Sequence, residues 1–176
     1  MHLVLVRHTS VDVPPGVCYG HTDVPVASGF AREAAEVAAQ LDGRDFDLVY
    51  TSPSSRCVML AEACGYPRAI RDPRLMEMDF GDWEMQRWDD ITDPRLQMWY
   101  DDWRHVAATG GESFADHAAR VASFMESLMA TGARSALVFA HGGTVMHAAL
   151  WRHPSPPADI FGLRPRYGGI IEIERN

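Results

Sequence analysis

Short apolar runs alternate with longer amphipathic segments along the 176-residue chain. The runs at 3–6, 46–52 and 135–143 are rich in β-branched residues and predict buried strands that end in polar side chains. A further strand is predicted over 169–173, after a rigid turn at the PSPP sequence of 154–157. Strands that alternate with helices predict an α/β fold, a three-layer sandwich whose mostly parallel central sheet is flanked by helices.

The segments between these runs have the periodicity of helices. The first helix is predicted to begin with Ser28 as its N-cap, and the second to begin near Ser54. The third, over 112–130, carries Ser113 and Asp116 in the spacing of a capping box. Its apolar residues form a stripe along one face, as in a helix that packs against a core.

Segment 73–111 differs from the rest because it holds four tryptophans and many acidic residues. A helix is predicted over 93–106, which would place Trp99 and Trp103 on one face. Such a face is typical of core packing, and the alternative is a wall that meets an organic leaving group. We interpret the segment as an excursion over the active edge of a single domain that spans 1–176.

Charge and composition argue against several classes of protein. The formal net charge is -8 at pH 7, whereas a general nucleic-acid binder needs clustered Lys and Arg. The chain shows no signal-peptide pattern and no apolar run of about 18 residues, so no membrane contact and a cytoplasmic location are predicted. Cys18, Cys57 and Cys64 include no Cys-x-x-Cys pair, which argues against a disulfide framework or a zinc site.

Reactive side chains follow the predicted strands. Because the carboxyl ends of parallel strands meet at one edge of a sheet, Arg7, His8 and His141 are expected to lie close together there. Arg56 begins the helix after the second strand, and Glu77 lies in a loop further along the chain. None of these residues is specific alone, because short motif matches are often accidental. Together they predict a phosphate pocket with a nucleophile and an acid.

The chemistry of phosphoryl transfer explains why these residue types would be needed. A planar guanidinium binds two phosphate oxygens at once and keeps its charge at any working pH. A neutral imidazole nitrogen can attack phosphorus and form a phosphohistidine, which water then hydrolyses. A carboxylic acid such as Glu77 could protonate the leaving alkoxide if neighbouring aromatic side chains raise its pKa.

Six short motifs, in order along nearly the whole chain, resemble those of the histidine phosphatase superfamily, also called phosphoglycerate mutase-like. They are VRHT, YGHTDVPV, DLVYTSPSSRC, LMEMDFGDWE, GGES and VFAHGG. The resemblance implies a phosphoglycerate mutase-like sandwich in which His8 is the nucleophile and Glu77 the proton donor. It implies that Arg7, Arg56 and His141 bind the phosphate, His141 being catalytic as well. It also implies a small-molecule phosphate monoester as substrate, with no cofactor and no metal.

Within the superfamily, the stretches CYGHTD and FGDWEM resemble the α-ribazole phosphatases. That resemblance implies removal of the 5′-phosphate of α-ribazole 5′-phosphate in cobalamin biosynthesis, with the dimethylbenzimidazole base stacked near Trp99. Three alternatives stay open: a broad-specificity sugar or nucleotide phosphatase, a phosphoglycerate mutase, and a pseudo-enzyme that binds phosphorylated ligands. The oligomeric state is open too, with a homodimer as one alternative.

The sequence departs from the common signature directly after the nucleophile. Thr9, Val11 and Pro14 stand in the region where the superfamily usually carries Gly, Thr and Asn, so two usual phosphate contacts are missing. The Thr9 hydroxyl has two alternatives, a phosphate ligand or a bond to nearby backbone. The residues predicted to bind substrate in their place are Tyr19, His21 and Thr22.

Other polar and aromatic residues lack such a context. Asp23 is expected to shape a turn, and Trp83 to pack beneath the acid loop. Cys18 is interpreted as a buried thiol without a reactive role. The remaining histidines are predicted to be surface or packing residues, and they are His2, His105, His117, His147 and His153.

Overall fold

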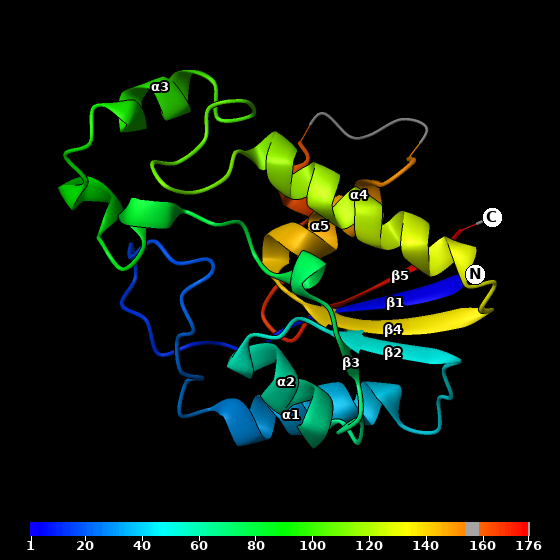
Figure 1. Cartoon of the computed structure of the whole chain (residues 1–176). Coiled ribbons are helices and arrows are strands. Elements are labelled where there is room, and N and C mark those ends of the chain that lie inside the picture. Colours follow the sequence, from blue (N-terminus) through cyan, green and yellow to red (C-terminus); the bar gives the residue numbers. More distant parts are fainter. Residues whose placement is uncertain (154–158, 176) are drawn as a thin grey trace.

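A five-stranded sheet runs through the centre of the molecule, in the strand order β3-β2-β4-β1-β5 (Figure 1). Its strands are β1 (His2–Arg7), β2 (Leu48–Thr51), β3 (Ile70–Arg71), β4 (Ser135–Ala140) and β5 (Ile170–Glu174). The structure, a computed structural model, describes residues 1–153 and 159–175. The turn predicted at 154–157 therefore lies outside the described residues.

Neighbouring strands are parallel except at one edge, where β5 pairs antiparallel with β1. The prediction of a mostly parallel sheet is thus confirmed. The run predicted over 135–143 is longer than the strand, because β4 ends at Ala140 and α5 (Gly142–Leu150) follows directly. Beyond the sheet edge the His141 carbonyl has no strand partner, and it instead accepts the 2.8 Å hydrogen bond from Val145 N that opens the helix.

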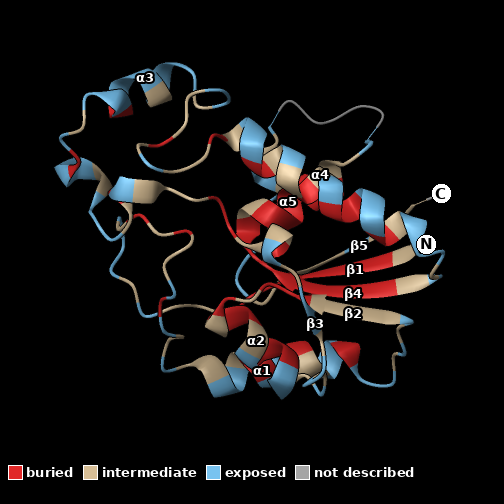
Figure 2. Cartoon of the chain, viewed as in Figure 1, coloured by how far each residue is buried: buried red, intermediate tan, exposed pale blue. Residues whose placement is uncertain are grey.

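Two helical layers cover the sheet, one on each face (Figure 1). One layer consists of α1 (Phe30–Leu41) and α2 (Ser55–Ala63), and the other of α4 (Phe114–Ala130) and α5. Alternate residues of β1 serve the two layers: Leu3 and Leu5 belong to the core under α4 and α5, whereas Val4 and Val6 belong to the core over α1 and α2. β1 and β4 are buried along most of their length (Figure 2), so their ends are firmly held.

The two longest helices begin differently. The predicted capping box of α4 is confirmed, because Asp116 N donates to Ser113 Oγ at 3.1 Å and Ser113 N donates to Asp116 Oδ2 at 3.0 Å. The predicted N-cap of α1 is wrong by one residue. Gly29 occupies that position without a side-chain cap, since the chain first makes a turn in which Phe30 N bonds the carbonyl of Ala27.

The start of α2 is capped from another part of the chain. Ser54 is the N-cap residue, yet its own side chain makes no capping bond. Asp23 instead accepts hydrogen bonds from Ser55 N and Ser55 Oγ, both at 2.9 Å. The expected structural role of Asp23 is therefore confirmed, and its effect is to fix the first turn of α2, which carries Arg56.

Segment 73–111 extends past the edge of the sheet at which β1 and β4 end (Figure 1). It contains the short 3-10 turns η1 (Pro73–Leu75), η2 (Gly81–Trp83) and η3 (Trp88–Asp90), and the helix α3 (Arg95–Asp101). The helix predicted over 93–106 is thus too long. Asp102 leaves the helical conformation, at φ -143° and ψ 68°, and its side chain accepts from His105 N at 3.3 Å. A short acidic side chain that bonds nearby backbone competes with helix formation in this way.

The shorter helix separates the two tryptophans that were expected to share a face. Trp99 stacks on Trp88, with ring centroids 5.6 Å apart. Trp103 lies outside α3 and packs edge-on against Phe114 at 4.8 Å. Trp83 is 1% exposed in a small apolar cluster, which confirms its predicted packing role.

The three cysteines are free, and burial raises the pKa of each thiol, to about 12 for Cys18 and Cys57 and about 11 for Cys64. At ordinary pH they stay protonated, which fits the interpretation of Cys18 as an unreactive buried thiol. None of the helices in the described residues is long and apolar enough to cross a membrane.

Candidate active site

The polar residues at the carboxyl ends of the strands lie together. His8 directly follows β1 and His141 directly follows β4, and their ring centroids are 5.2 Å apart. Arg56 reaches the same place from the first turn of α2, and Ser52 from the end of β2. All four residues are at most 2% exposed. The convergence predicted for the strand ends is therefore present in the structure.

His8 is held in one tautomer and one charge state. Its Nδ1 lies 2.7 Å from the carbonyl oxygen of Thr9, which can only accept, so Nδ1 carries the hydrogen. Burial, and then the nearby Arg56, lower the pKa of His8 to about 3. The ring is thus neutral at ordinary pH, and the lone pair of its Nε2 is free to attack an electrophile.

His141 and Arg56 orient each other. Arg56 donates to the carbonyl of Gly20 at 2.7 Å, and one of its Nη atoms lies 3.2 Å from Nδ1 of His141. Since a guanidinium only donates, Nδ1 of His141 accepts, and its Nε2 hydrogen is left for Ser52 Oγ at 2.8 Å. Burial and Arg56 hold the pKa of His141 well below its ordinary value, so this ring is neutral too.

Several donors around His8 are buried without a hydrogen-bond partner. They are the Nε atoms of Arg7 and Arg56 and the hydroxyl of Thr9. A buried polar atom left unpaired costs on the order of 1–3 kcal/mol, so a pocket with this set favours an anion that accepts from it. The alternative in which the Thr9 hydroxyl bonds nearby backbone is not formed.

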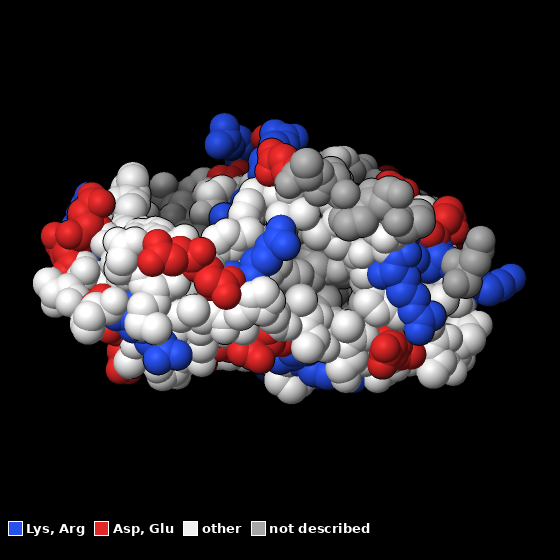
Figure 3. All heavy atoms as spheres, turned by 90° about the horizontal axis from the view of Figure 1, so that it is seen from above, with Lys and Arg blue, Asp and Glu red and all other residues white. Residues whose placement is uncertain are grey.

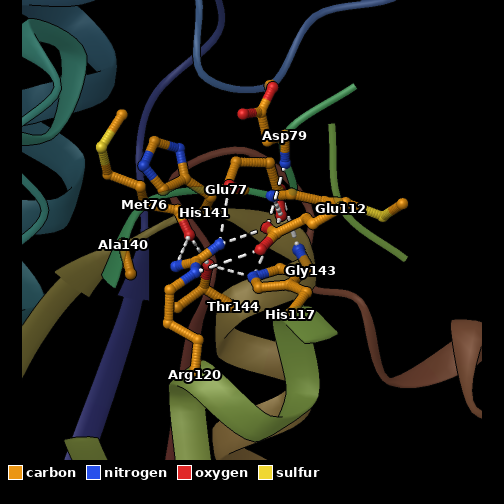
Figure 4. A network of polar contacts seen from close by, with 12 residues as sticks. Met76, Glu77, Asp79, Glu112, His117, Arg120, Ala140, His141, Gly143 and Thr144 are labelled. Atoms are coloured by element: carbon orange, nitrogen blue, oxygen red, sulfur yellow. Dashed lines mark hydrogen bonds and ion pairs between the residues drawn. The ribbon is translucent and has the colours of Figure 1, made fainter. Parts of the chain in front are cut away.

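Glu77 lies at the start of α5 and is ionised. Its carboxylate accepts from Gly143 N at 3.0 Å and from Met78 N at 3.1 Å (Figure 4). Burial by itself would raise the pKa of Glu77, but His117, the Gly143 amide and Arg164 outweigh it and lower the pKa to about 2. The expectation that aromatic neighbours raise this pKa is therefore wrong, because the carboxylate sits among N–H donors and cations rather than against apolar rings.

The backbone that carries Glu77 is held from α4. Arg120 donates to the carbonyls of Met76 at 2.9 Å and Glu77 at 3.1 Å, and it also pairs with Glu112 (Figure 4). His117 lies 3.9 Å from the Glu77 carboxylate and 3.1 Å from Thr144 Oγ1. Of the two positions predicted for His117, surface or packing, the structure shows the buried one, since the side chain is 1% exposed. The prediction did not include its place in this network of polar contacts.

The other histidines outside the motifs are placed as predicted where the structure describes them fully. His147 is buried and packs on Phe114, with ring centroids 4.3 Å apart. His2 and His105 lie at the surface beside acidic side chains, Glu174 and Asp102 respectively. These residues therefore have packing and surface positions away from His8.

The loop predicted to bind substrate is fastened by Glu84. Its carboxylate accepts from His21 N at 2.7 Å, from Thr22 N at 2.6 Å and from the Thr22 hydroxyl. The Thr22 hydroxyl is thus already paired. The backbone carbonyl of Thr22 accepts a hydrogen bond from Arg56 at 3.0 Å. Tyr19 lines the cavity described below, and its hydroxyl lies 2.7 Å from that of Tyr167. Of the predicted substrate ligands, Tyr19 and His21 keep groups available to a ligand.

An aromatic cavity of about 400 Å³ opens next to Glu77. Trp88 and Trp99 form one part of its lining, with their rings stacked at an interplanar angle of 21°. The polar lining is limited to residues beside the phosphate pocket, such as Glu77 and Arg164. Other aromatic residues that line it are Tyr19, Phe80, Tyr100, Trp103, Phe114 and Phe161. Core packing was the expected role of the Trp99 and Trp103 face, whereas both residues line a cavity, as in the alternative interpretation. More of the chain than one helix face builds this wall.

Charged groups elsewhere form no single basic face in the view from above, where acidic and basic side chains are interspersed (Figure 3). Within residues 1–153 and 159–175, no three or more His, Cys, Asp or Glu side chains are grouped so as to hold a metal ion. The positive charge that could meet an anionic substrate is thus local to the pocket at Arg7 and Arg56.

Comparison with known proteins decides the family. A model of the histidine phosphatase superfamily (branch 1) matches residues 3–176. The chain belongs to this superfamily. Two similar proteins are both named adenosylcobalamin/alpha-ribazole phosphatase. The one from Salmonella typhimurium is 29% identical over 177 residues, covering 96% of this chain and 87% of that protein. The one from Escherichia coli is 32% identical over 136 residues, covering 73% of this chain and 66% of that protein.

The structural comparison agrees. The crystal structure of the alpha-ribazole phosphatase from Shigella flexneri matches with a TM-score of 0.90 at 28% identity, covering 100% of this chain and 91% of that chain. The superfamily resemblance and the phosphoglycerate mutase-like fold are thus confirmed. The superfamily and these phosphatase relatives identify the chain as a phosphatase.

This histidine phosphatase has site residues that its six motifs do not include. Arg7 donates to the carbonyl of Pro165 at 2.7 Å, and its guanidinium lies 3.9 Å from the ring centre of Tyr167. Tyr167 also lies 5.6 Å from the His8 ring, and Arg164 lines the cavity. The only sequence signal for residues 164–167 is their position before the last strand. Contacts between the two ends of a chain leave no local pattern in the sequence.

Proposed function

We propose that this histidine phosphatase hydrolyses α-ribazole 5′-phosphate through a phosphohistidine formed on His8. The observation that carries the proposal is the neutral His8 with a free Nε2, beside unpartnered guanidinium donors and next to an aromatic cavity. The relatives named for alpha-ribazole support the choice of substrate. The roles of the individual residues follow from where each group lies.

In the first half-reaction, Nε2 of His8 attacks phosphorus and a P–N bond forms while the P–O bond to the leaving group breaks. The electron pair of that bond goes to the departing oxygen, which takes a proton from Glu77. Arg7 and Arg56 stabilise the charge on the equatorial oxygens, with their unpartnered Nε atoms as donors. The products are the free alcohol, phospho-His8 and ionised Glu77.

In the second half-reaction, water attacks phospho-His8 from the side that the alcohol has left. Glu77, now ionised, takes a proton from the water as the new P–O bond forms. The P–N bond breaks and its electron pair returns to Nε2 of His8. His8, Glu77 and the two arginines are thereby restored, and the net change is one ester and one water converted to one alcohol and inorganic phosphate.

The proton on Glu77 arrives with the substrate. The free protein holds this carboxylate ionised, with its pKa lowered to about 2. A phosphate monoester loses its second proton near pH 6, with a pKa of about 6, so its monoanion brings a proton into the pocket. The negative charge of the bound phosphate also raises the affinity of the neighbouring carboxylate for that proton.

The aromatic cavity lies where the leaving group must be. Because Glu77 protonates the departing oxygen, the organic part of the substrate extends from Glu77 into the cavity that this residue lines. The base of α-ribazole is a planar dimethylbenzimidazole, and stacked indole rings such as Trp88 and Trp99 suit a flat aromatic partner. A sugar phosphate or phosphoglycerate would leave these rings without a partner.

The proposal is tested by measuring phosphate release from α-ribazole 5′-phosphate, an aryl phosphate, a nucleoside 5′-monophosphate and a sugar phosphate. We expect the highest kcat/KM for α-ribazole 5′-phosphate. His8→Ala should lower kcat/KM for every substrate by about 10⁴-fold or more, as expected when a covalent nucleophile is removed. His105→Ala, at an exposed histidine outside the site, is the matched control and should change nothing.

Each alternative has its own outcome in this assay. Release from none of the four substrates would favour the pseudo-enzyme, and a higher kcat/KM for the sugar or nucleotide phosphate would favour broad specificity. A burst with bisphosphoglycerate followed by transfer to phosphoglycerate rather than to water would favour a mutase. Loss of activity on adding a chelator would contradict the proposed mechanism, which routes no step through a metal.

A further inference from the structure

Arg164 points at the phosphate pocket from the segment between η4 (Phe161–Leu163) and β5. A methyl group at Gly142 would lie 2.5 Å from Nε of Arg164 and 3.1 Å from Nε of Arg7. Both guanidinium groups therefore lie against the same stretch of backbone, the first turn of α5. Arg164 also lines the aromatic cavity together with Glu77.

The two arginines lack the acidic partners that would normally separate them. Among the described side chains, no carboxylate lies within ion-pair distance of Arg7 or Arg164. Burial, and next the charge of Arg164, lower the pKa of Arg7, so the two cations repel each other. Glu77 is a carboxylate close enough to interact with both arginines, but it forms an ion pair with neither. An anion bound between the two guanidinium groups would therefore relieve their repulsion.

The pocket also lacks two ligands that the common signature would provide. Val11 pairs with Val26 in an isolated β-bridge, and Pro14 uses its carbonyl to accept from Val17 N at 3.2 Å. Neither side chain can donate to a phosphate. The two side chains therefore leave the phosphate with fewer donors than the common signature provides.

We propose that Arg164 binds the phosphoryl group of the substrate, beside Arg7 and next to Glu77. This proposal rests on the proposed function, because it assigns Arg164 to the same phosphoryl group. Arg164 holds an equatorial oxygen in both half-reactions, and as a planar donor it adds to the contacts of Arg7 and Arg56. It thus lies at the junction between the phosphate pocket and the aromatic cavity.

The test compares Arg164→Ala and Arg164→Lys with Arg166→Ala, which removes the same charge two residues further along. The readouts are inhibition by orthovanadate and inorganic phosphate, inhibition by dephosphorylated α-ribazole, and kcat and KM for an aryl phosphate. Arg164→Ala should weaken orthovanadate inhibition and lower the aryl phosphate kcat/KM by about tenfold to a hundredfold. Inhibition by α-ribazole should be unchanged, Arg164→Lys should restore part of the loss, and Arg166→Ala should match the parent protein.

Two results would overturn the proposal. One is unchanged inhibition by orthovanadate and phosphate in an Arg164→Ala protein whose thermal unfolding matches that of Arg166→Ala. The other is weaker inhibition by α-ribazole alone, which would place Arg164 on the leaving group. Because the orthovanadate and aryl phosphate measurements need no particular natural substrate, they remain decisive even if α-ribazole 5′-phosphate proves to be the wrong ester. If Arg164→Ala acted only through Glu77, kcat/KM for the aryl phosphate would stay unchanged, because an aryl leaving group needs no proton from Glu77.

Discussion

The phosphate pocket and the aromatic cavity share Glu77 and Arg164 as neighbours, but they are built in different ways. The pocket gathers side chains from the ends of β1, β2 and β4, which are held by two apolar cores. Half of the residues that line the cavity come from segment 73–111, where the chain has short turns, the helix α3 and no strand of the sheet. The rest come from Tyr19, α4, α5 and the segment that precedes β5. We therefore expect the reaction to depend on the ends of the strands, and the choice of leaving group to depend largely on segment 73–111, since loops can vary independently of a scaffold.

The two regions also differ in how their groups are satisfied. In the pocket, the Nε atoms of Arg7 and Arg56 have no hydrogen-bond partner and could donate to a bound anion. Rings in the cavity pack on each other, as Trp88 does on Trp99 and Phe80. We therefore expect changes in the pocket to affect every substrate and changes in the cavity to affect only large ones.

Glu77→Gln should give the largest effect that depends on the substrate. For an ester with an alkoxide leaving group, kcat should fall by about 10²- to 10⁴-fold, the usual contribution of a general acid. For an aryl phosphate, whose leaving group needs no proton, the rate of the first half-reaction should fall far less. The measurement is the rate of alcohol release in the first turnover for the two kinds of ester, and equal losses would show that Glu77 is not the acid.

Trp99→Leu should have a smaller effect, confined to the aromatic ester. Removing a stacking ring is expected to lower kcat/KM for α-ribazole 5′-phosphate by about tenfold to a hundredfold, as for other base–aromatic stacks. A sugar phosphate should be hydrolysed at an unchanged rate. Trp151→Leu, at a half-buried tryptophan outside the cavity, is the matched control. Equal losses for both esters would mean that the cavity supports the pocket rather than selecting the leaving group.

Much of the pocket could be predicted because its determinants are local. Apolar runs with polar ends identify the strands, and parallel strands bring their ends together, so His8 and His141 meet although they are far apart in the chain. The capping box of α4 could likewise be predicted from the four residues 113–116 alone. Each of these features depends on a short pattern and one general rule of folding.

The features that could not be predicted from the sequence depend on contacts between distant parts of the chain. Arg164 and Tyr167 reach the pocket only because β5 pairs with β1 at the edge of the sheet. The lowered pKa of Glu77 depends on the amide of Gly143 and on Arg164, neither of which is near it in sequence. Periodicity gave no sign that Asp102 would end α3. Sequence patterns indicate where an element lies, but they do not indicate which side chains another segment will bring to it.

Buried histidines should also give the protein a pH-dependent stability, the smallest of these effects. Burial lowers the pKa of His8 and His117 to about 3 and of His147 to about 4, from 6.5. Below pH 6.5 the unfolded chain binds protons that the folded protein does not, so the free energy of unfolding falls as the pH falls. Each such histidine contributes up to about 1.4 kcal/mol per pH unit, roughly a tenfold change in the folding equilibrium.

Urea unfolding at pH 7, 6 and 5 measures this dependence. His8→Asn should make the slope of the unfolding free energy against pH shallower by one histidine. His105→Ala, at an exposed histidine outside the site, is the control for removing a histidine. The same slope in His8→Asn as in the parent protein would show that His8 is not held neutral by burial, and the contrast between a buried pocket and an open cavity would then be weaker.

The most direct test of the central claim is to trap the phosphorylated residue. The protein is mixed with α-ribazole 5′-phosphate, quenched at alkaline pH within the first turnover, and mapped by mass spectrometry of its peptides. One phosphoryl group should be found on the peptide that contains His8, and it should be absent from His8→Ala. A protein that releases phosphate without ever carrying a phosphoryl group on His8, or that carries it on another residue, would contradict the account.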